Sequence, residues 1–132
     1  EKAIPGTTYY RVPRYYTYGQ FTRFIEAGSH RVDVEAIPSE EDQFPAELLM
    51  SAYVKDNTYT IVLVNSSEKE SFSTLVEIEG KSFQNMIAYT SSEDVKWQRK
   101  KINPSLSGLR SITVPKLSVV TVTGKIKDIA AE

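Results

Sequence analysis

Carboxylate pairs are the residues of this chain that could carry out hydrolysis, and Glu77 and Glu79 form such a pair within a recognisable element. Glycoside hydrolysis needs two carboxyl groups on either side of the scissile bond, one of them in a site that raises its pKa. Residues 72–79 alternate between apolar and polar side chains, so both glutamates should leave the same face of a strand toward water. We therefore predict no catalytic residue in this chain.

His30 is the only histidine, so a nucleophilic triad or a zinc site would have to be built around it. The sequence contains neither the Gly-x-Ser-x-Gly turn of a serine nucleophile nor the His-Glu-x-x-His zinc motif. Cysteine is absent, which excludes disulfides and thiolate metal sites. We expect no metal site and no cofactor, and we interpret His30 as a loop residue.

Trp97 is the candidate for sugar contact, because the apolar faces of sugars stack on aromatic rings. Its position between Lys96 and Gln98, close to a polar turn, also fits a ring that covers the end of a sheet. Packing is the commoner role for such a residue, and we favour it while keeping the sugar contact open.

The triplet Asn65-Ser66-Ser67 matches the acceptor pattern for N-linked glycosylation. Triplets of this kind arise readily by chance. We therefore assign it no role.

An aromatic stripe near the N-terminus predicts a helix over residues 13–25. Its members recur at intervals of three and four, which places them on one helical face. Pro13 suits the first turn of a helix, and Gly28 suits the left-handed residue that closes one. The stripe consists of Tyr15, Tyr18, Phe21 and Ile25, with Phe24 beside it.

Seven of the fourteen aromatic residues lie in the first 24 positions, more than a small sandwich needs for its own core. We therefore expect Tyr15, Tyr18 and Phe21 to contact another domain, or to cause self-association when that domain is missing. For Phe21, Phe24 and Ile25, packing against the chain's own core is almost as good an explanation.

The same segment resembles glycoside hydrolase family 30, the glucosylceramidase and xylanase family. There a similar pattern joins the last helix of a catalytic (β/α)8 barrel to the C-terminal part of a β-sandwich. Thr22 replaces a serine and Ala27 a proline of that pattern. Residues 112–122 are similar to the closing strands of the family's sandwich. The matching residues are Tyr15, Tyr16, Gly19, Gln20, Phe21, Phe24, Ile25, Gly28 and Ser29.

This resemblance implies a non-catalytic domain that braces a barrel in the same parent chain. The family's two catalytic glutamates would precede residue 1, and the parent would hydrolyse a β-linked glycoside with retention and without a cofactor. It also implies a secreted, periplasmic or cell-surface protein. The alternative is an independent carbohydrate-binding module, which would present surface aromatics to polysaccharide. An adhesin-like structural domain is a third alternative.

Short segments with strand patterns indicate an all-β fold, an antiparallel β-sandwich of about seven or eight strands with one N-terminal helix. Asp56-Asn57 should form a hairpin turn, and the strand after it is apolar on both faces, as in the middle of a sheet. We divide the chain into a junction at 1–28, a sandwich at 29–125 and a tail at 126–132. The predicted strands cover residues 31–37, 48–55, 59–65, 72–79, 86–90, 111–114 and 117–123.

Composition limits the partners. The 132 residues suit one domain, and 16 basic against 17 acidic residues give a net charge of −1. We predict no nucleic-acid partner, and we interpret Arg99-Lys100-Lys101 and Glu40-Glu41-Asp42 as solvated loop positions. No apolar run is long enough to span a membrane, and the start Glu1-Lys2 is not a signal peptide, so we expect any targeting sequence to have been removed or to lie upstream.

Overall fold

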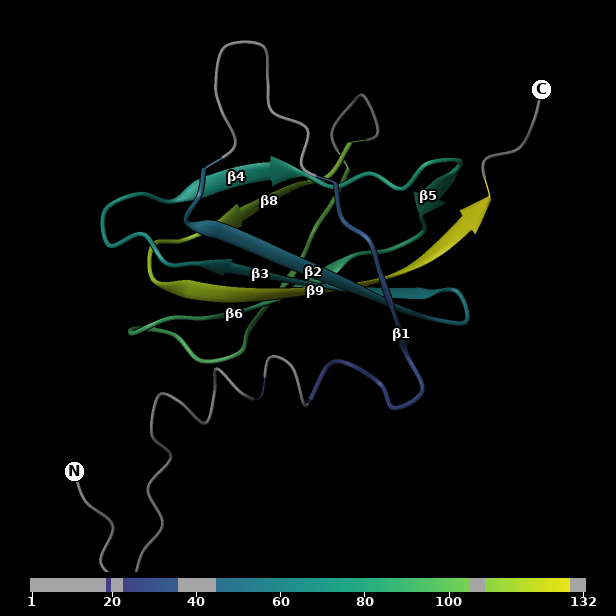
Figure 1. Ribbon diagram of the computed structural model, residues 1–132, viewed down its shortest axis with the longest axis horizontal. Helices are drawn as coiled ribbons and strands as arrows, with labels where there is room; N and C mark the ends of the chain where they lie inside the picture. Colours follow the sequence, from purple (N-terminus) through teal and green to yellow (C-terminus); the bar gives the residue numbers. More distant parts are fainter. Residues whose placement is uncertain (1–18, 20–22, 36–44, 105–108, 129–132) are drawn as a thin grey trace, which may run out of the picture.

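The computed structural model describes residues 19, 23–35, 45–104 and 109–128, and this part of the chain is nearly all β-structure (Figure 1). Every pair of neighbouring strands is antiparallel. The strands are β1 (His30–Val32), β2 (Leu48–Lys55), β3 (Thr58–Asn65), β4 (Phe72–Leu75), β5 (Lys81–Phe83), β6 (Ile87–Ser91), β7 (Gln98–Lys101), β8 (Ser111–Val114) and β9 (Ser118–Asp128).

A large and a small sheet form the two layers of the sandwich. The large sheet has the strand order β1-β2-β3-β9-β6-β7, with β5 paired to the end of β9. The small sheet consists of β4 and β8, which lie above the large sheet in Figure 1. The predicted fold class, an all-β antiparallel sandwich, is confirmed. Most of the predicted helix at 13–25 lies outside the described residues, and within them only Gly19 has helical conformation.

The predicted hairpin around Asp56-Asn57 is confirmed. Strands β2 and β3 pair from Leu48↔Asn65 to Lys55↔Thr58, and Asp56 has a φ of 54°, which a short polar side chain tolerates at a tight turn. Strand β3 lies between β2 and β9, and its consecutive residues Ile61, Val62 and Leu63 are all buried. It is therefore the two-sided middle strand that its sequence predicts.

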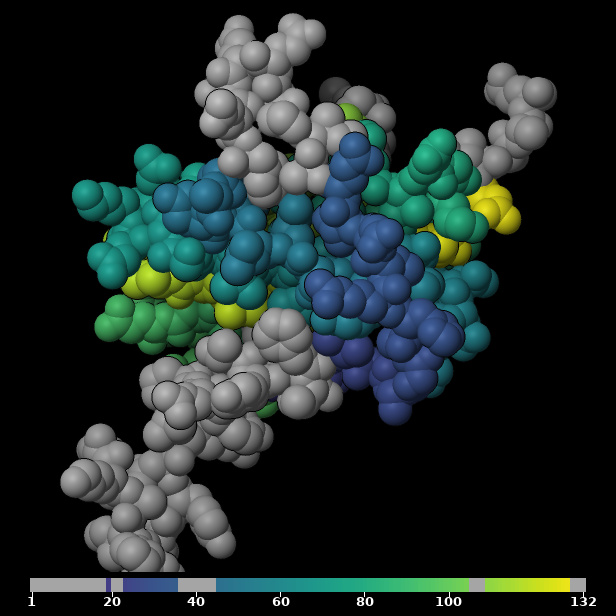
Figure 2. Space-filling model, viewed as in Figure 1, coloured from purple at the N-terminus to yellow at the C-terminus, as the bar shows by residue number. Residues whose placement is uncertain are grey.

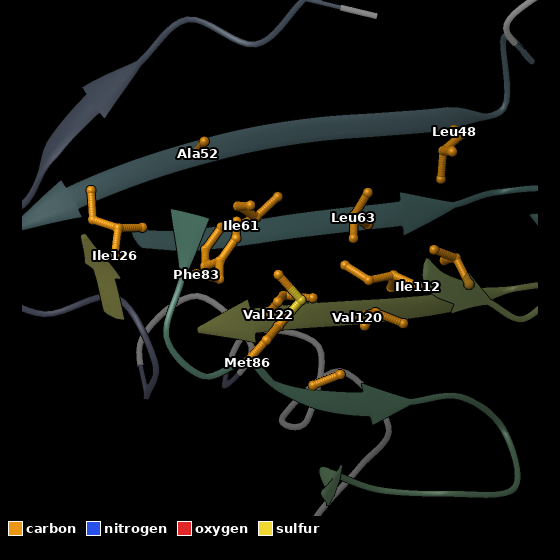
Figure 3. Packing of buried hydrophobic residues seen from close by; sticks show 12 residues of the cluster. Leu48, Ala52, Ile61, Leu63, Phe83, Met86, Ile112, Val120, Val122 and Ile126 are labelled. Carbon is orange, nitrogen blue, oxygen red and sulfur yellow. The ribbon is translucent and has the colours of Figure 1, made fainter. Parts of the chain in front are cut away.

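The hydrophobic core fills the space between the two sheets (Figure 3). Strand alternation sends every second side chain of β2, β3, β6 and β9 toward it, and β8 closes it from the other side. The core residues are Leu48, Ala52, Ile61, Leu63, Phe83, Met86, Ala88, Ile112, Val114, Val120, Val122 and Ile126.

The C-terminal boundary differs from the prediction. Strand β9 continues to Asp128, so the sandwich does not end at residue 125, and the tail is at most residues 129–132, which lie outside the described part. The extension is stabilised because Ile126 is buried in the core and β5 pairs with its end. Gly124 allows this arrangement, since a Cβ there would overlap the carbonyl oxygen of Asn85.

Four further predictions need correction. Strand β1 covers only His30–Val32, residues 33–35 are exposed and non-strand, and His30 begins the strand instead of lying in a loop. Strand β4 ends at Leu75, before the predicted end at residue 79, and the chain turns at Gly80, where φ is 73°. Strand β5 was not predicted. Arg99-Lys100-Lys101 belongs to β7, whose four residues are all exposed, so no hydrophobic alternation reveals this edge strand.

Candidate functional site

The face of the large sheet opposite the core is covered as well. Val62, Thr121 and Tyr89 are neighbours on this face, because Val62 pairs with Thr121 and Thr121 with Tyr89. Val62 and Thr121 are fully buried, although they do not face the small sheet. The segment that precedes β1, purple in Figure 1, runs below β6 and β9. Figure 2 shows this segment and β1, in purple and blue, lying against the body of the sheet.

Phe24 connects this segment to the sheet. Its ring stacks on that of Tyr89 with a centroid distance of 4.1 Å and an interplanar angle of 23°. It also meets the ring of Trp97 edge to face, at 6.4 Å and 88°. Stacked and edge-to-face pairs add to the free energy gained by burying the rings. The aromatic segment therefore packs against its own sandwich through Phe24, the alternative that the sequence left open.

Trp97 lies at the centre of this contact. Its backbone N–H donates to the buried Ser91 hydroxyl oxygen at 2.9 Å, and its φ of 47° is unusual for a bulky residue. Such a conformation persists only where the surroundings fix it. The guanidinium carbon of Arg23 lies 4.5 Å from the indole centroid, within cation–π range. The ring is half-buried and held by residues of the motif segment.

The closeness of Gly19 to Trp97 explains why the family-like motif has a glycine at this position. A Cβ built on Gly19 would overlap Cζ2 of Trp97, so only glycine lets the chain pass this close to the indole. The Arg23 N–H donates to the Gly19 carbonyl oxygen at 2.9 Å, which is the hydrogen bond of one helical turn. This turn brings Arg23 back over the ring.

Between Phe24 and β1 the chain turns at Gly28 and forms an ion pair through Glu26. Gly28 has a φ of 91°, which confirms the left-handed conformation predicted for it. The Ser29 N–H donates to the Glu26 carbonyl oxygen at 3.1 Å across this turn. The Glu26 carboxylate lies 3.5 Å from Lys55 Nζ of β2, but this ion pair is exposed and contributes little.

The predicted site residues have separate outcomes. Tyr15, Tyr18 and Phe21, predicted to contact another domain, lie outside the described residues. Trp97 is brought together with Phe24, Arg23 and Tyr89, and its sugar contact stays a prediction. Sequence reasoning missed Arg23 and Tyr89, because nothing in the alternation of residues 86–90 singles out Tyr89 from other half-buried strand residues.

Asn65 has a structural role that its glycosylation-like triplet conceals. The side chain is 1% exposed, and its Nδ2 donates to the carbonyl oxygens of Glu70, Val114 and Pro115 at 2.8, 3.1 and 3.1 Å. Its Oδ1 accepts from the Ser67 N–H at 2.9 Å. Both the nitrogen and the oxygen of this amide are therefore hydrogen-bonded, and the residue is buried in the folded chain.

Potential hydrolytic groups do not converge in the part of the chain that the structure describes. Glu77 and Glu79 are both exposed. No group of three His, Cys, Asp or Glu residues among the described ones could hold a metal ion. A hydrogen bond and the charge of Lys81 lower the pKa of Asp128, whereas a general acid needs a raised pKa. In the part of the chain that the structure describes, no helix is long and apolar enough to cross a membrane.

A depression of about 500 Å³ lies beside β1 and holds no such constellation either. It is lined by Arg31, Val32, Asp33, Val34, Met50 and Ser51.

No protein-family model and no curated protein matches this chain. Solved structures do. An endoxylanase of family 30 from Clostridium papyrosolvens C71 is 26% identical, with a TM-score of 0.71, and the match covers 86% of this chain but 28% of that enzyme. A family 30 subfamily 8 xylanase from Clostridium acetobutylicum is 24% identical, with a TM-score of 0.70, and the match covers 86% of this chain and 28% of that enzyme.

A conserved exported protein from Bacteroides fragilis shares the fold, with 18% identity, a TM-score of 0.67, and coverage of 83% of this chain and 21% of that protein. This chain thus corresponds to less than two thirds of each neighbour. The resemblance to glycoside hydrolase family 30 is confirmed by these comparisons, and this chain has the fold of a part of the family 30 xylanases.

Proposed function

We propose that this chain is the non-catalytic C-terminal β-sandwich region of a family 30-like glycoside hydrolase, and that it braces a catalytic (β/α)8 barrel. One observation carries the proposal: the similarity covers 86% of this chain but only 28% of a family 30 endoxylanase. In the family pattern, the motif that contains Gly19 and Phe24 leads out of the barrel into the sandwich. A sandwich that is preceded in the chain by this motif matches the C-terminal region of such an enzyme.

The contacts of the motif segment suggest how the brace works. Gly19, Arg23 and Phe24 are fitted to Trp97 and Tyr89 of the sandwich. A chain that enters through a packed segment has little freedom at the junction, unlike one that enters through a flexible linker. The junction at 1–28 would therefore hold the barrel at a fixed position, and the sandwich at 29–128 would be its support.

The chemistry of the parent follows from the family resemblance. Two glutamates of the barrel would hydrolyse a β-linked glycoside with retention, which requires carboxyl groups about 5 Å apart and no cofactor. The family resemblance also implies that the parent is secreted, periplasmic or at the cell surface. The exported neighbour from Bacteroides fragilis agrees with this location.

The gene sequence upstream of Glu1 tests the proposal. We expect it to encode a barrel of about 250 residues with a glutamate at the ends of two strands. If no barrel is encoded there, the brace is wrong and an independent carbohydrate-binding module takes its place. The purified 132-residue chain is the matched enzymatic test, and we expect it to leave xylan, aryl β-glycosides and glucosylceramide intact.

A further inference from the structure

Strand β7 presents two cations to the face of the sheet that carries Tyr89. Arg99 pairs with Tyr89 and Lys101 with Ile87, and paired residues of an antiparallel sheet share a face. Lys100 pairs with Ala88 and therefore belongs to the opposite face. The face of Tyr89 thus carries Arg99 and Lys101 at the open edge of the sheet.

Arg23 adds a third cation to the same area. Phe24 stacks on Tyr89, and the Arg23 guanidinium carbon lies 5.7 Å from the Phe24 centroid and 4.5 Å from that of Trp97. An arginine that stacks on aromatic rings keeps the N–H groups at the rim of its guanidinium, which are suited to bidentate binding of a carboxylate. Arg23 is exposed, so these groups reach the solvent.

These three cations, which we call the β7 cation cluster (Arg23, Arg99 and Lys101), have no carboxylate partner among the described residues. The ion pairs of this part of the chain are Lys55–Glu26 and Lys81–Asp128. Glu93 and Asp94, in the turn before Trp97, pair with none of the three. Charges at a sheet edge also prevent pairing with another sheet. Edge protection does not explain Arg23, which lies on another segment beside the aromatic rings.

We propose that the β7 cation cluster, with Tyr89 and Phe24, is a surface binding site for acidic polysaccharide. Arg23 and Arg99 would bind the carboxylates of uronic acid residues, and the half-buried aromatic rings would contact the apolar sugar face. Nucleic acid fits less well, because three cations on a chain with a net charge of −1 do not form the extended basic surface that a phosphate backbone needs. All residues named in this site belong to this chain.

Titration calorimetry of the 132-residue chain with oligogalacturonides, at low and at physiological salt, tests the site. We expect binding that the double variant Arg23→Gln, Arg99→Gln weakens at least about tenfold, since each charge-assisted hydrogen bond is worth roughly that factor. Lys100→Gln is the matched control, because it removes the same charge from the same strand on the other face, and it should bind like the parent. Arg99→Lys keeps the charge but loses the planar guanidinium that can form two hydrogen bonds to one carboxylate. Its affinity should therefore lie between that of the double variant and that of the parent.

The proposal would be overturned by no binding by the parent chain, by equal loss with Lys100→Gln, or by equally tight binding of a DNA oligonucleotide. Neutral xylo-oligosaccharides should bind more weakly than the acidic ones. Thermal melts establish that each variant is folded. In NMR spectra of the parent, oligogalacturonide should shift the Tyr89 and Phe24 ring resonances, and binding without these shifts would refute the assigned position. None of these results depends on whether a barrel is encoded upstream.

Discussion

The side-chain amide of Asn65 donates a hydrogen bond to the carbonyl oxygen of Val114 at 3.1 Å and so joins the end of β3 in the large sheet to the end of β8 in the small one. The same amide bonds to Glu70 and Pro115. One buried side chain therefore fixes two strand ends and the loop between β3 and β4.

Asn65→Ala should lower the free energy of unfolding by about 3 kcal/mol, because it removes the amide donor to the buried Val114 carbonyl and to the Glu70 carbonyl, whereas the Pro115 carbonyl keeps the Ser118 hydroxyl as a donor. Urea unfolding measures the loss. Ser66→Ala is the control, since the neighbouring Ser66 is exposed and its hydroxyl makes a single long bond to the Glu47 carbonyl at 3.2 Å. Equal stability of the two variants would contradict this role of Asn65.

Gly19→Ala should displace the motif segment from the indole ring, because a Cβ at this position overlaps Trp97. Trp97 is the only tryptophan, so its fluorescence reports on the contact directly. We expect a red-shifted emission that is quenched more easily by iodide. Gly80→Ala is the control: it places a methyl group in open space at a φ of 73° and should cost some stability without changing the emission. An unchanged Gly19→Ala spectrum would mean that the segment does not depend on this close approach.

Trp97→Ala should lower the free energy of unfolding by about 2 kcal/mol, less than the 3 to 5 kcal/mol typical of a fully buried large side chain. The ring is half-buried, and its loss removes the contacts with Arg23 and Phe24. Thermal and urea unfolding measure the change. A variant that unfolds like the parent but is no longer retarded by polysaccharide in affinity electrophoresis would favour the sugar-contact role.

The ion pair of Lys81 and Asp128, 2.7 Å apart, predicts a defined pH dependence. The hydrogen bond and charge of Lys81 lower the pKa of Asp128, and those of Asp128 raise the pKa of Lys81. The contribution of Asp128 to stability is thus complete above the pKa of an unfolded aspartate and is lost as the pH falls through its lowered folded value. That of Lys81 is complete below the unfolded lysine pKa and is lost as the pH rises through its raised folded value.

An NMR titration of the Asp128 carboxyl carbon checks this behaviour. Lys81→Ala should return the pKa of Asp128 toward the ordinary carboxylate range, and added salt should reduce the shift because the pair is exposed. If the titration of Asp128 is the same in the parent and in Lys81→Ala, the ion pair does not form in solution.

Tyr15 and Tyr18 give a prediction outside the described residues. We expect the isolated chain to hide this aromatic stripe, either by self-association or by folding the Tyr9 to Tyr18 segment against itself, since an exposed apolar surface of this kind usually forms a contact. Replacing both tyrosines with serine should relieve the association at little cost in stability. Sedimentation at several concentrations measures it. A strictly monomeric parent chain whose double variant unfolds would show that the stripe belongs to the sandwich core.

Local patterns allowed much of the sandwich to be predicted. The β2–β3 hairpin follows from alternation around Asp56-Asn57, and the conformation of Gly28 from its place after a helical pattern. Strand β7 has no buried side chain, so its sequence carries no periodic signal. The contact of Phe24 with Tyr89 joins residues far apart in sequence, and neither residue alone indicates the other. The candidate site therefore became visible only through the pairing of β6 with β7 and β9.

Strand β9 determines when this domain can fold during synthesis. It is the final strand of the described chain, yet β3, β5 and β6 all pair with it. The β2–β3 hairpin can form as soon as it leaves the ribosome, whereas the large sheet stays open along β3 until β9 has been translated. A stop codon before Ser118 would thus remove the centre of the sheet and not merely its end, leaving a nascent protein with an exposed strand edge and no way to complete its fold.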